Sequence, residues 1–176
     1  MILEANRIHA DWLADPTDGV NALLATTPRD AGDAQAADLE TITDETRDGD
    51  VARGELPSTL PGIAVSTDVV DDVEGQVMVV TRDGRVKLRI RVGLDNADTA
   101  EGMRDLSYYL RTVVRSLNRL YDADANDAAR TRNEIYLETC HDLTFAIART
   151  KDPAGVVTVA GYVFTTVQMR DLNPKG

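Results

Sequence analysis

The sequence contains one cysteine, Cys140, and no long apolar run. A lone thiol excludes an intrachain disulfide framework and any zinc site built on several cysteines. No segment approaches the ~20 apolar residues of a membrane-spanning helix, and residues 1–7 lack the basic stretch of a secretory signal. We therefore expect a soluble protein, inside the cell or bound to a particle, with no membrane contact.

Lysine and glutamate are also scarce. The acids are 22 Asp and 8 Glu, the bases are 16 Arg and 3 Lys, and the formal net charge is −11. Short hydrated carboxylates and few ammonium stems suit high salt, where screening weakens self-repulsion. This composition favours a halophilic source, with a high-GC genome as the alternative. Because an acidic surface repels phosphates, we expect no tight or specific DNA binding.

Catalytic motifs are missing as well. The sequence has no glycine-rich phosphate loop, no dinucleotide-binding fingerprint and no pair of carboxylates at acid–base spacing. Cys140, His141 and Asp142 have the residue types of a triad, but neighbours on a strand point to opposite faces, so the thiol and the imidazole are not expected to pair. The other histidine, His9, is predicted to be a satisfied imidazole at the core edge or an interface. We expect no enzyme activity and no cofactor.

Two acidic clusters supply oxygen atoms of the kind that bind Ca²⁺. Residues 122–127 have the alternate spacing that opens an EF-hand loop, but Asp127 replaces the required glycine and Asn133 replaces the bidentate glutamate. The second cluster consists of Asp68, Asp71, Asp72 and Glu74. Such clusters arise by chance in so acidic a chain, and we expect no metal site.

The most regular pattern lies in residues 85–92, where cations and aliphatic residues alternate without a break. In a strand the aliphatic residues would line a core, and the other face would carry the cations Arg85, Lys87, Arg89 and Arg91. Cations about 7 Å apart repel one another and require acidic groups nearby. Glu134 and Glu138 could supply these groups within an ordinary sheet face; alternatively, the four cations form a subunit contact.

Three helices are predicted. Residues 2–13 carry an apolar stripe at helical spacing, and Asp15 and Pro16 suit the N-cap and first position of a short second helix. A long helix begins at residues 98–101, a capping-box-like start with Asp98 as the cap, and its apolar stripe continues to Leu120. The opposite side of this helix carries Arg104, Tyr108, Arg111, Arg115 and Arg119. This basic surface is predicted to be solvated or to contact aspartates of another chain.

Residues 26–62 show no periodic pattern and contain nine acids and three arginines, with Leu39, Ile42 and Val51 as isolated apolar residues. A structureless stretch of this length is uncommon inside a compact domain and is usually functional or ordered by a partner. We expect an extended acidic arm or loop that lies on a neighbouring subunit. A surface insertion without a role is the alternative.

Strands are predicted at 63–67, 76–81, 85–92, 134–149 and 156–169, with hairpin turns at 81–84 and 151–155. The last strand is apolar on both faces, which indicates a central or doubly covered position. Strands interrupted by one long helix predict a single α+β domain over residues 1–176, with a mostly antiparallel sheet of about five strands. The long helix and the N-terminal helical segment are expected to pack on one face of it.

The order of these elements resembles the tail terminator proteins of tailed bacteriophages and archaeal tailed viruses, as does the proline-bounded entry at 56–65, which reads Leu-Pro and then Leu-Pro-Gly-Ile-Ala-Val. The resemblance implies a small α+β subunit that closes into a hexameric ring on the head-proximal end of a tail tube. It also implies the tube protein and a head-side connector as partners, a lumen that genome DNA crosses, and a place in the virion. It brings no catalytic residues, and residues 26–62 are longer than the short link it implies.

A ring needs a contact in which one patch of a subunit meets a different patch of the next, and a cationic strand with an acidic arm offers such a pair. Together with this possible ring contact, the resemblance implies a non-enzymatic tail-terminator subunit. The candidate interface residues are Arg85, Lys87, Arg89, Arg91, Arg104, Arg111, Arg115 and Arg119. The alternatives are another neck or tail-tube subunit, and a small cellular ligand-binding α+β module.

Overall fold

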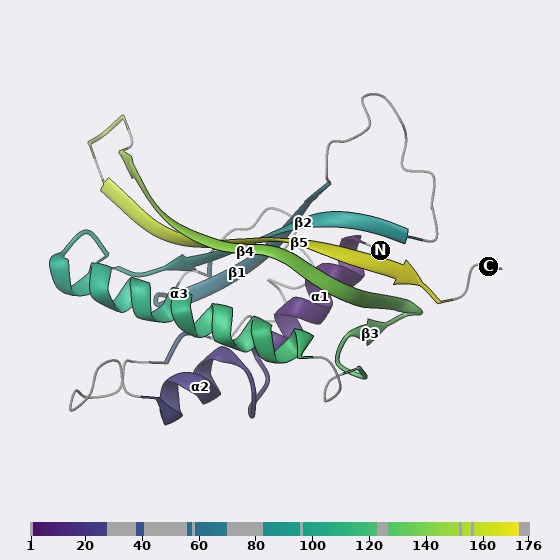
Figure 1. Ribbon diagram of the computed structural model, residues 1–176. Coiled ribbons are helices and arrows are strands. Elements are labelled where there is room, and N and C mark those ends of the chain that lie inside the picture. Colours follow the sequence, from purple (N-terminus) through teal and green to yellow (C-terminus); the bar gives the residue numbers. More distant parts are fainter. Residues whose placement is uncertain are drawn as a thin grey trace.

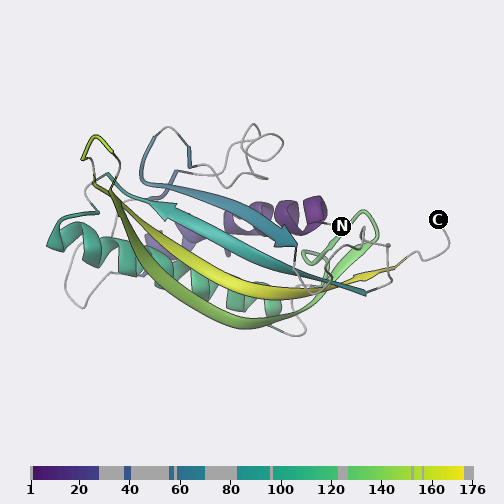
Figure 2. The same cartoon turned by 90° about the horizontal axis from the view of Figure 1, so that it is seen from above.

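The computed structural model describes residues 2–27, 38–40, 56–57, 59–69, 83–95, 97–122, 127–151, 153–155 and 157–172. Three helices, α1 (Ile2–Leu13), α2 (Val20–Thr26) and α3 (Ala100–Tyr121), lie on one side of a sheet (Figure 1, Figure 2). The strands are β1 (Gly62–Val69), β2 (Asp83–Gly93), β3 (Thr131–Arg132), β4 (Ile135–Lys151) and β5 (Val157–Asp171). The predicted α+β class is confirmed.

The sheet is antiparallel throughout, in the order β1-β2-β5-β4-β3. β5 therefore occupies the central position that its apolar sequence indicated. The short β3 has no counterpart among the predicted strands, and the predicted strand at 76–81 lies outside the described residues. The predicted turn at Asp83 and Gly84 is wrong, because both residues belong to β2 and pair with Arg170 and Met169 of β5.

The core lies between the sheet and the helices. The aliphatic residues of β2 are buried on this side, as the alternation predicted, and Leu106, Leu110 and Leu117 of α3 are fully buried against them. Gly161 of β5 allows α3 to approach, because a Cβ at this position would lie 2.7 Å from Leu110 Cδ1. The amphipathic pattern of α3 thus produces the predicted packing of one long helix on the sheet.

The start of α3 differs from the prediction by one residue. Thr99, and not Asp98, is the N-cap, and its hydroxyl oxygen accepts a hydrogen bond from Gly102 N at 2.9 Å. A threonine side chain in this position satisfies one of the free N–H groups of the first turn. The helix itself extends from 100 to 121 as its apolar stripe indicated.

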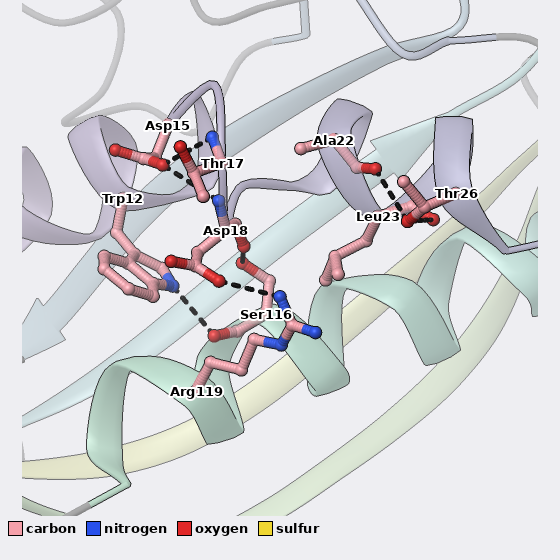
Figure 3. Close-up of polar contacts among 9 residues, drawn as sticks. All are labelled: Trp12, Asp15, Thr17, Asp18, Ala22, Leu23, Thr26, Ser116 and Arg119. Carbon is pink, nitrogen blue, oxygen red and sulfur yellow. Dashed lines mark hydrogen bonds and ion pairs between the residues drawn. The ribbon is translucent and has the colours of Figure 1, made fainter. Parts of the chain in front are cut away.

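The connection between α1 and α2 also differs from the prediction. Asp15 Oδ1 accepts hydrogen bonds from Thr17 N at 2.7 Å and Asp18 N at 2.9 Å, so Asp15 stabilises a turn (Figure 3). α2 begins later, at Val20, with Gly19 as its N-cap. The prediction of Asp15 and Pro16 as the helix start is therefore wrong, because the side chain of Asp15 bonds to the turn instead.

Polar contacts join α1 and this turn to the C-terminal third of α3 (Figure 3). Trp12 Nε1 donates to Ser116 O at 2.8 Å, and Ser116 Oγ donates to Asp18 O at 2.9 Å. Arg119 forms an ion pair of 2.7 Å with the carboxylate of Asp18. The helical layer is thus held together by polar side-chain contacts as well as by the packing of apolar side chains.

His9 is completely buried between α1 and the end of α3. Its Nδ1 lies 2.6 Å from Ala5 O, and its Nε2 lies 2.7 Å from the hydroxyl of Tyr121. Burial lowers the pKa of His9 to about 4, so the imidazole is neutral near neutral pH. The prediction of a satisfied imidazole is confirmed.

Residues 39 and 40 of the acidic stretch 26–62 are anchored to their own domain. Leu39 belongs to the core and is 2% exposed, while Glu40 N donates to Pro61 O at 2.7 Å beside the start of β1. Leu39 is therefore not an isolated apolar residue of a free arm. Residues 28–37 and 41–55, on either side of this anchor, lie outside the described residues. Within the described helices, none is long and apolar enough to cross a membrane.

Candidate functional site

The sheet has a second face that the three helices do not cover, which we call the helix-free face (Figure 1, Figure 2). By the pairing register, β2 contributes the cations to this face and β5 contributes alternate residues beside them. The neighbouring pairs are Lys87 with Thr166, Arg89 with Phe164, and Arg91 with Tyr162. Arg85 continues the row in register, and its side chain lies outside the described part.

Two bulges in β4 decide which of its residues lie on this face. They are at 137–139 and 141–144, and each adds one residue to β4 relative to β5. An unbroken strand would place Thr139 and His141 on the core side and Cys140 on the other. The first bulge reverses this segment, so that Cys140 faces the core, and the second restores the original alternation. The bulges therefore keep two polar side chains out of the core.

Asp142 lies in the second bulge with a φ of 55°, in the left-handed region that aspartate tolerates better than most residues. The Thr165 hydroxyl donates to His141 O at 2.6 Å and holds the bulge against β5. Asp142 borders the helix-free face as a result. The sequence pattern suggested Asp142 only as a member of a triad, because a bulge has no clear signal in the alternation.

A groove of about 330 Å³ lies on the helix-free face beside this bulge. It combines cationic, hydroxyl, carboxylate and aromatic groups from three adjacent strands. These groups belong to Lys87 and Arg89 of β2, Asp142 and Thr144 of β4, and Phe164 and Thr166 of β5. Such a lining can bind an extended chain that presents both charged and apolar groups.

No ion pair between described side chains includes Lys87, Arg89 or Arg91. Two carboxylates are nevertheless close to this row: the register places Asp68 of β1 opposite Lys87, with the Asp68 side chain outside the described part, and Asp142 borders the same groove. Arg89 Nε donates to Ser66 Oγ at 3.3 Å, and Arg91 Nε is buried without a hydrogen-bond partner. Arg89 and Arg91 have no carboxylate directly across from them on β1 or β5, so an acidic group from elsewhere can pair with them.

Internal neutralisation was one of the two interpretations of the cationic strand. Glu138, one of the two expected sources, forms an ion pair with Arg170 of β5. β5 also lies between β4 and β2 in the sheet. Glu138 therefore does not neutralise the cations of β2, and the subunit contact stays a prediction.

Two aromatic residues on the helix-free face were not singled out by the sequence pattern. The rings of Tyr162 and Phe164 stack at a centroid distance of 5.9 Å and an angle of 16°, and Phe164 is 39% exposed. The apolar residues on both faces of β5 indicated a central or doubly covered strand. β5 is central, but the described residues place no helix over its second face (Figure 2).

The two lateral edges of the sheet are also open within the described residues. The outer edge of β4 pairs with β3 only at Ile135 and Tyr136, and β1 has a single bridge, between Glu40 and Gly62. Phe145, on the helix side of β4, is 56% exposed. The hairpin end of β4 and β5 curls away from α3 (Figure 1), and every described residue from 148 to 158 is exposed.

The arginines of α3 form a separate surface on the outside of the helical layer. Arg104, Arg111 and Arg115 are exposed, whereas Arg119 is bound to Asp18 of the same chain. Tyr108 was predicted on this surface, but it is buried and its hydroxyl donates to Thr27 O. The eight interface candidates therefore divide between two opposite sides of the molecule.

The discounted chemical motifs have other roles in the structure. Cys140 Sγ lies 3.1 Å from Thr165 Oγ1 on the core side, and burial raises the pKa of this thiol, whereas His141 Nε2 lies 2.9 Å from Thr139 Oγ1 on the helix-free face. Asp127 accepts hydrogen bonds from Arg130 and from the Tyr136 hydroxyl, and Arg130 holds the pKa of Asp127 below its usual value.

The acidic clusters do not form a metal site where they can be assessed. The described residues include no group of three His, Cys, Asp or Glu side chains arranged to hold a metal ion. Residues 123–126 of the first cluster lie outside the described residues. So do Asp71, Asp72 and Glu74 of the second.

No family model matches the sequence, and no curated protein or solved structure matches it significantly.

Proposed function

We propose that this chain is a structural subunit that assembles edge to edge into a closed ring, as the tail terminator of a tailed virus. The observation that carries the proposal is the sheet with two open edges on opposite sides, β1 and the greater part of β4, among the described residues. Open edges offer rows of backbone donors and acceptors to another chain.

The two edges differ, and this favours a directional contact. β1 is short, whereas β4 extends from 137 to 151 beyond its pairing with β3 and carries the exposed Phe145. A contact between unlike patches repeats from one subunit to the next and closes when the rotation permits. An exposed apolar edge is otherwise an aggregation hazard, so burial against a neighbour gives it a role.

The order of helices and strands resembles that of tail terminators, and this resemblance supports the assignment of the ring to a terminator. In that role one face of the ring binds the tail tube protein, the other binds the head-side connector, and genome DNA crosses the lumen. The net charge of −11 suits passage of DNA without adhesion. The ring is hexameric in this proposal, and the protein belongs to the virion.

The test is the mass of the protein by light scattering, with negative-stain images of the same samples, in molar and in low salt, with and without tail tubes. We expect annular particles, formed either by the protein alone or after tubes are added. Phe145→Lys should reduce annular particles at least tenfold, because it places a charge in the contact. Leu172→Lys is the matched control, since Leu172 is similarly exposed (51%) and lies just after the C-terminal end of β5, away from Phe145.

The outcomes separate the alternatives. Open filaments would assign the chain to the tail tube, because a tube subunit continues to polymerise. A monomer that is indifferent to salt and to tubes would overturn the proposal and favour a ligand-binding module. Unchanged rings in Phe145→Lys, with rings lost in Leu172→Lys, would move the contact away from the β4 edge.

A further inference from the structure

We propose that the groove on the helix-free face binds the acidic segment 41–55 of a neighbouring copy of the chain. The inference rests on the proposed function, since a ring brings a second copy to the edge of the sheet. It assigns a ligand class, an extended acidic peptide, to a groove that the edge contact alone leaves without a role.

Charge complementarity is the first argument. Lys87 and Arg89 line the groove and belong to no ion pair between described side chains, and Arg91 follows them along β2. The cations of the row outnumber the nearby carboxylates, which are Asp68, opposite Lys87 in the register, and Asp142 in the groove. Segment 41–55 contains five acids and two arginines. Binding it would replace repulsion among neighbouring cations by attraction to carboxylates.

The spacing of the charges is the second argument. Cations on one face of β2 recur every two residues, about 7 Å apart. If residues 44–50 are extended, Asp44, Asp48 and Asp50 fall on one side of the segment, at the same period. Phe164 and the Thr144 and Thr166 hydroxyls offer apolar contact and hydrogen bonds between the charges.

The reach of the segment is the third argument. Its ends are anchored at the same end of the sheet, because Glu40 bonds to Pro61 and Leu56 packs on Gly93. A chain of 15 residues fixed at both ends can reach outward by at most about half its extended length, which is about 25 Å. If β1 of one copy lies beside β4 of the next, the groove is centred two strands away, about 10 Å across the sheet.

A single-stranded nucleic acid is the competing occupant, since stacked aromatic residues and cations also suit bases and phosphates. Two features disfavour it. Asp142 places a carboxylate in the groove, and the chain as a whole repels polyanions through its net charge of −11. A short acidic segment with its own arginines can accommodate Asp142, whereas a continuous phosphate backbone cannot.

Zero-length carbodiimide cross-linking tests the contact, because it joins a lysine amine to a carboxylate that touches it, and Lys87 is one of three lysines in the chain. Rings are assembled from equal amounts of ¹⁴N and ¹⁵N protein and analysed by mass spectrometry. We expect amides between Lys87 and segment 41–55 that include mixed-isotope pairs. Same-isotope pairs alone, or rings in which Lys87 has no link to this segment, would overturn the inference.

Peptide binding separates this inference from the proposed function. The protein is the Phe145→Lys variant, which keeps it monomeric, and the acids of its own 41–55 segment are changed to amides so that this segment does not occupy the groove. A labelled peptide of residues 41–55 is then titrated with this protein, and binding is followed by fluorescence anisotropy. We expect binding that weakens at least tenfold in Lys87→Glu/Arg89→Glu and with salt, and that is unchanged in the control Arg111→Glu. Equal binding by the groove variant would overturn the inference, as would preference for a single-stranded thymidine oligonucleotide over the peptide. Either result leaves the ring proposal standing.

Discussion

The two faces of the sheet are built from the same strands but are covered differently. On the helix-covered face, Leu88 and Ile90 of β2 are buried under the helices, while Lys87 and Arg89, their immediate neighbours, border an open groove on the helix-free face. The period of two in a strand lets one segment supply stability on one side and a charged surface on the other. Substitutions on the two faces should therefore differ in what they change.

The largest difference is expected between Leu110→Ala and Phe164→Ala. Leu110 is fully buried against Gly161 of β5, so its truncation should lower the free energy of unfolding by about 3 kcal/mol through lost burial and an unfilled cavity. Phe164 is 39% exposed and loses mainly its stacking on Tyr162, about 1 kcal/mol. Urea unfolding of both variants measures the difference. Equal losses would mean that the helix-free face is as much a part of the core as the other.

The two histidines sharpen the comparison, since His9 is on the helix side and His141 on the helix-free face. Burial lowers the pKa of His9 from 6.5 to about 4, so as the pH falls the unfolded chain takes up the proton first and unfolding is favoured. The contribution of His9 is intact above pH 6.5 and decreases between pH 6.5 and 4, by at most about 3 kcal/mol.

Urea unfolding at pH 7 and pH 4.5 tests this expectation. His9→Gln should lose less stability between the two pH values than the wild type, because it has no imidazole to protonate. His141→Gln is the matched control and should lose as much as the wild type. The same loss in His9→Gln and in the wild type would assign the acid sensitivity to other groups.

The smallest effect is expected outside both faces, at the ion pair between Arg119 and Asp18. The two side chains are 47% and 33% exposed, and water screens such a pair. Arg119→Ala should lower the free energy of unfolding by less than about 1 kcal/mol, and less still in molar salt. A double-mutant cycle with Asp18→Asn measures the pair itself. A coupling above about 2 kcal/mol would show that this pair fixes the turn between α1 and α2 on α3.

The sequence predicted elements whose signal is a repeated pattern. The alternation at 85–92 predicted which residues of β2 are buried, and the stripe from Met103 to Leu120 predicted the packing of α3. Boundaries were less accurate where a side chain has two possible roles. Asp15 bonds to a turn and Thr99 caps α3, and propensity alone does not separate these uses.

The groove was beyond the reach of pattern reasoning because it depends on the order of strands and on a bulge. Lys87, Asp142 and Phe164 come from three strands that are adjacent only in the folded sheet. The row of cations could be predicted, since its residues are close in sequence. The aromatic pair at Tyr162 and Phe164 had a weaker signal, because apolar residues on both faces of a strand also indicate complete burial.

The two bulges of β4 have a consequence for how this strand can change in length. Each adds one residue, and together they leave Phe145 and the rest of the hairpin on the same sides as in a regular strand. Removing one of the added residues would turn the outer half of β4 inside out, whereas removing both would preserve it. Insertions and deletions in this strand should therefore be accepted in pairs, so an even number of residues is the unit in which the strand can be lengthened or shortened.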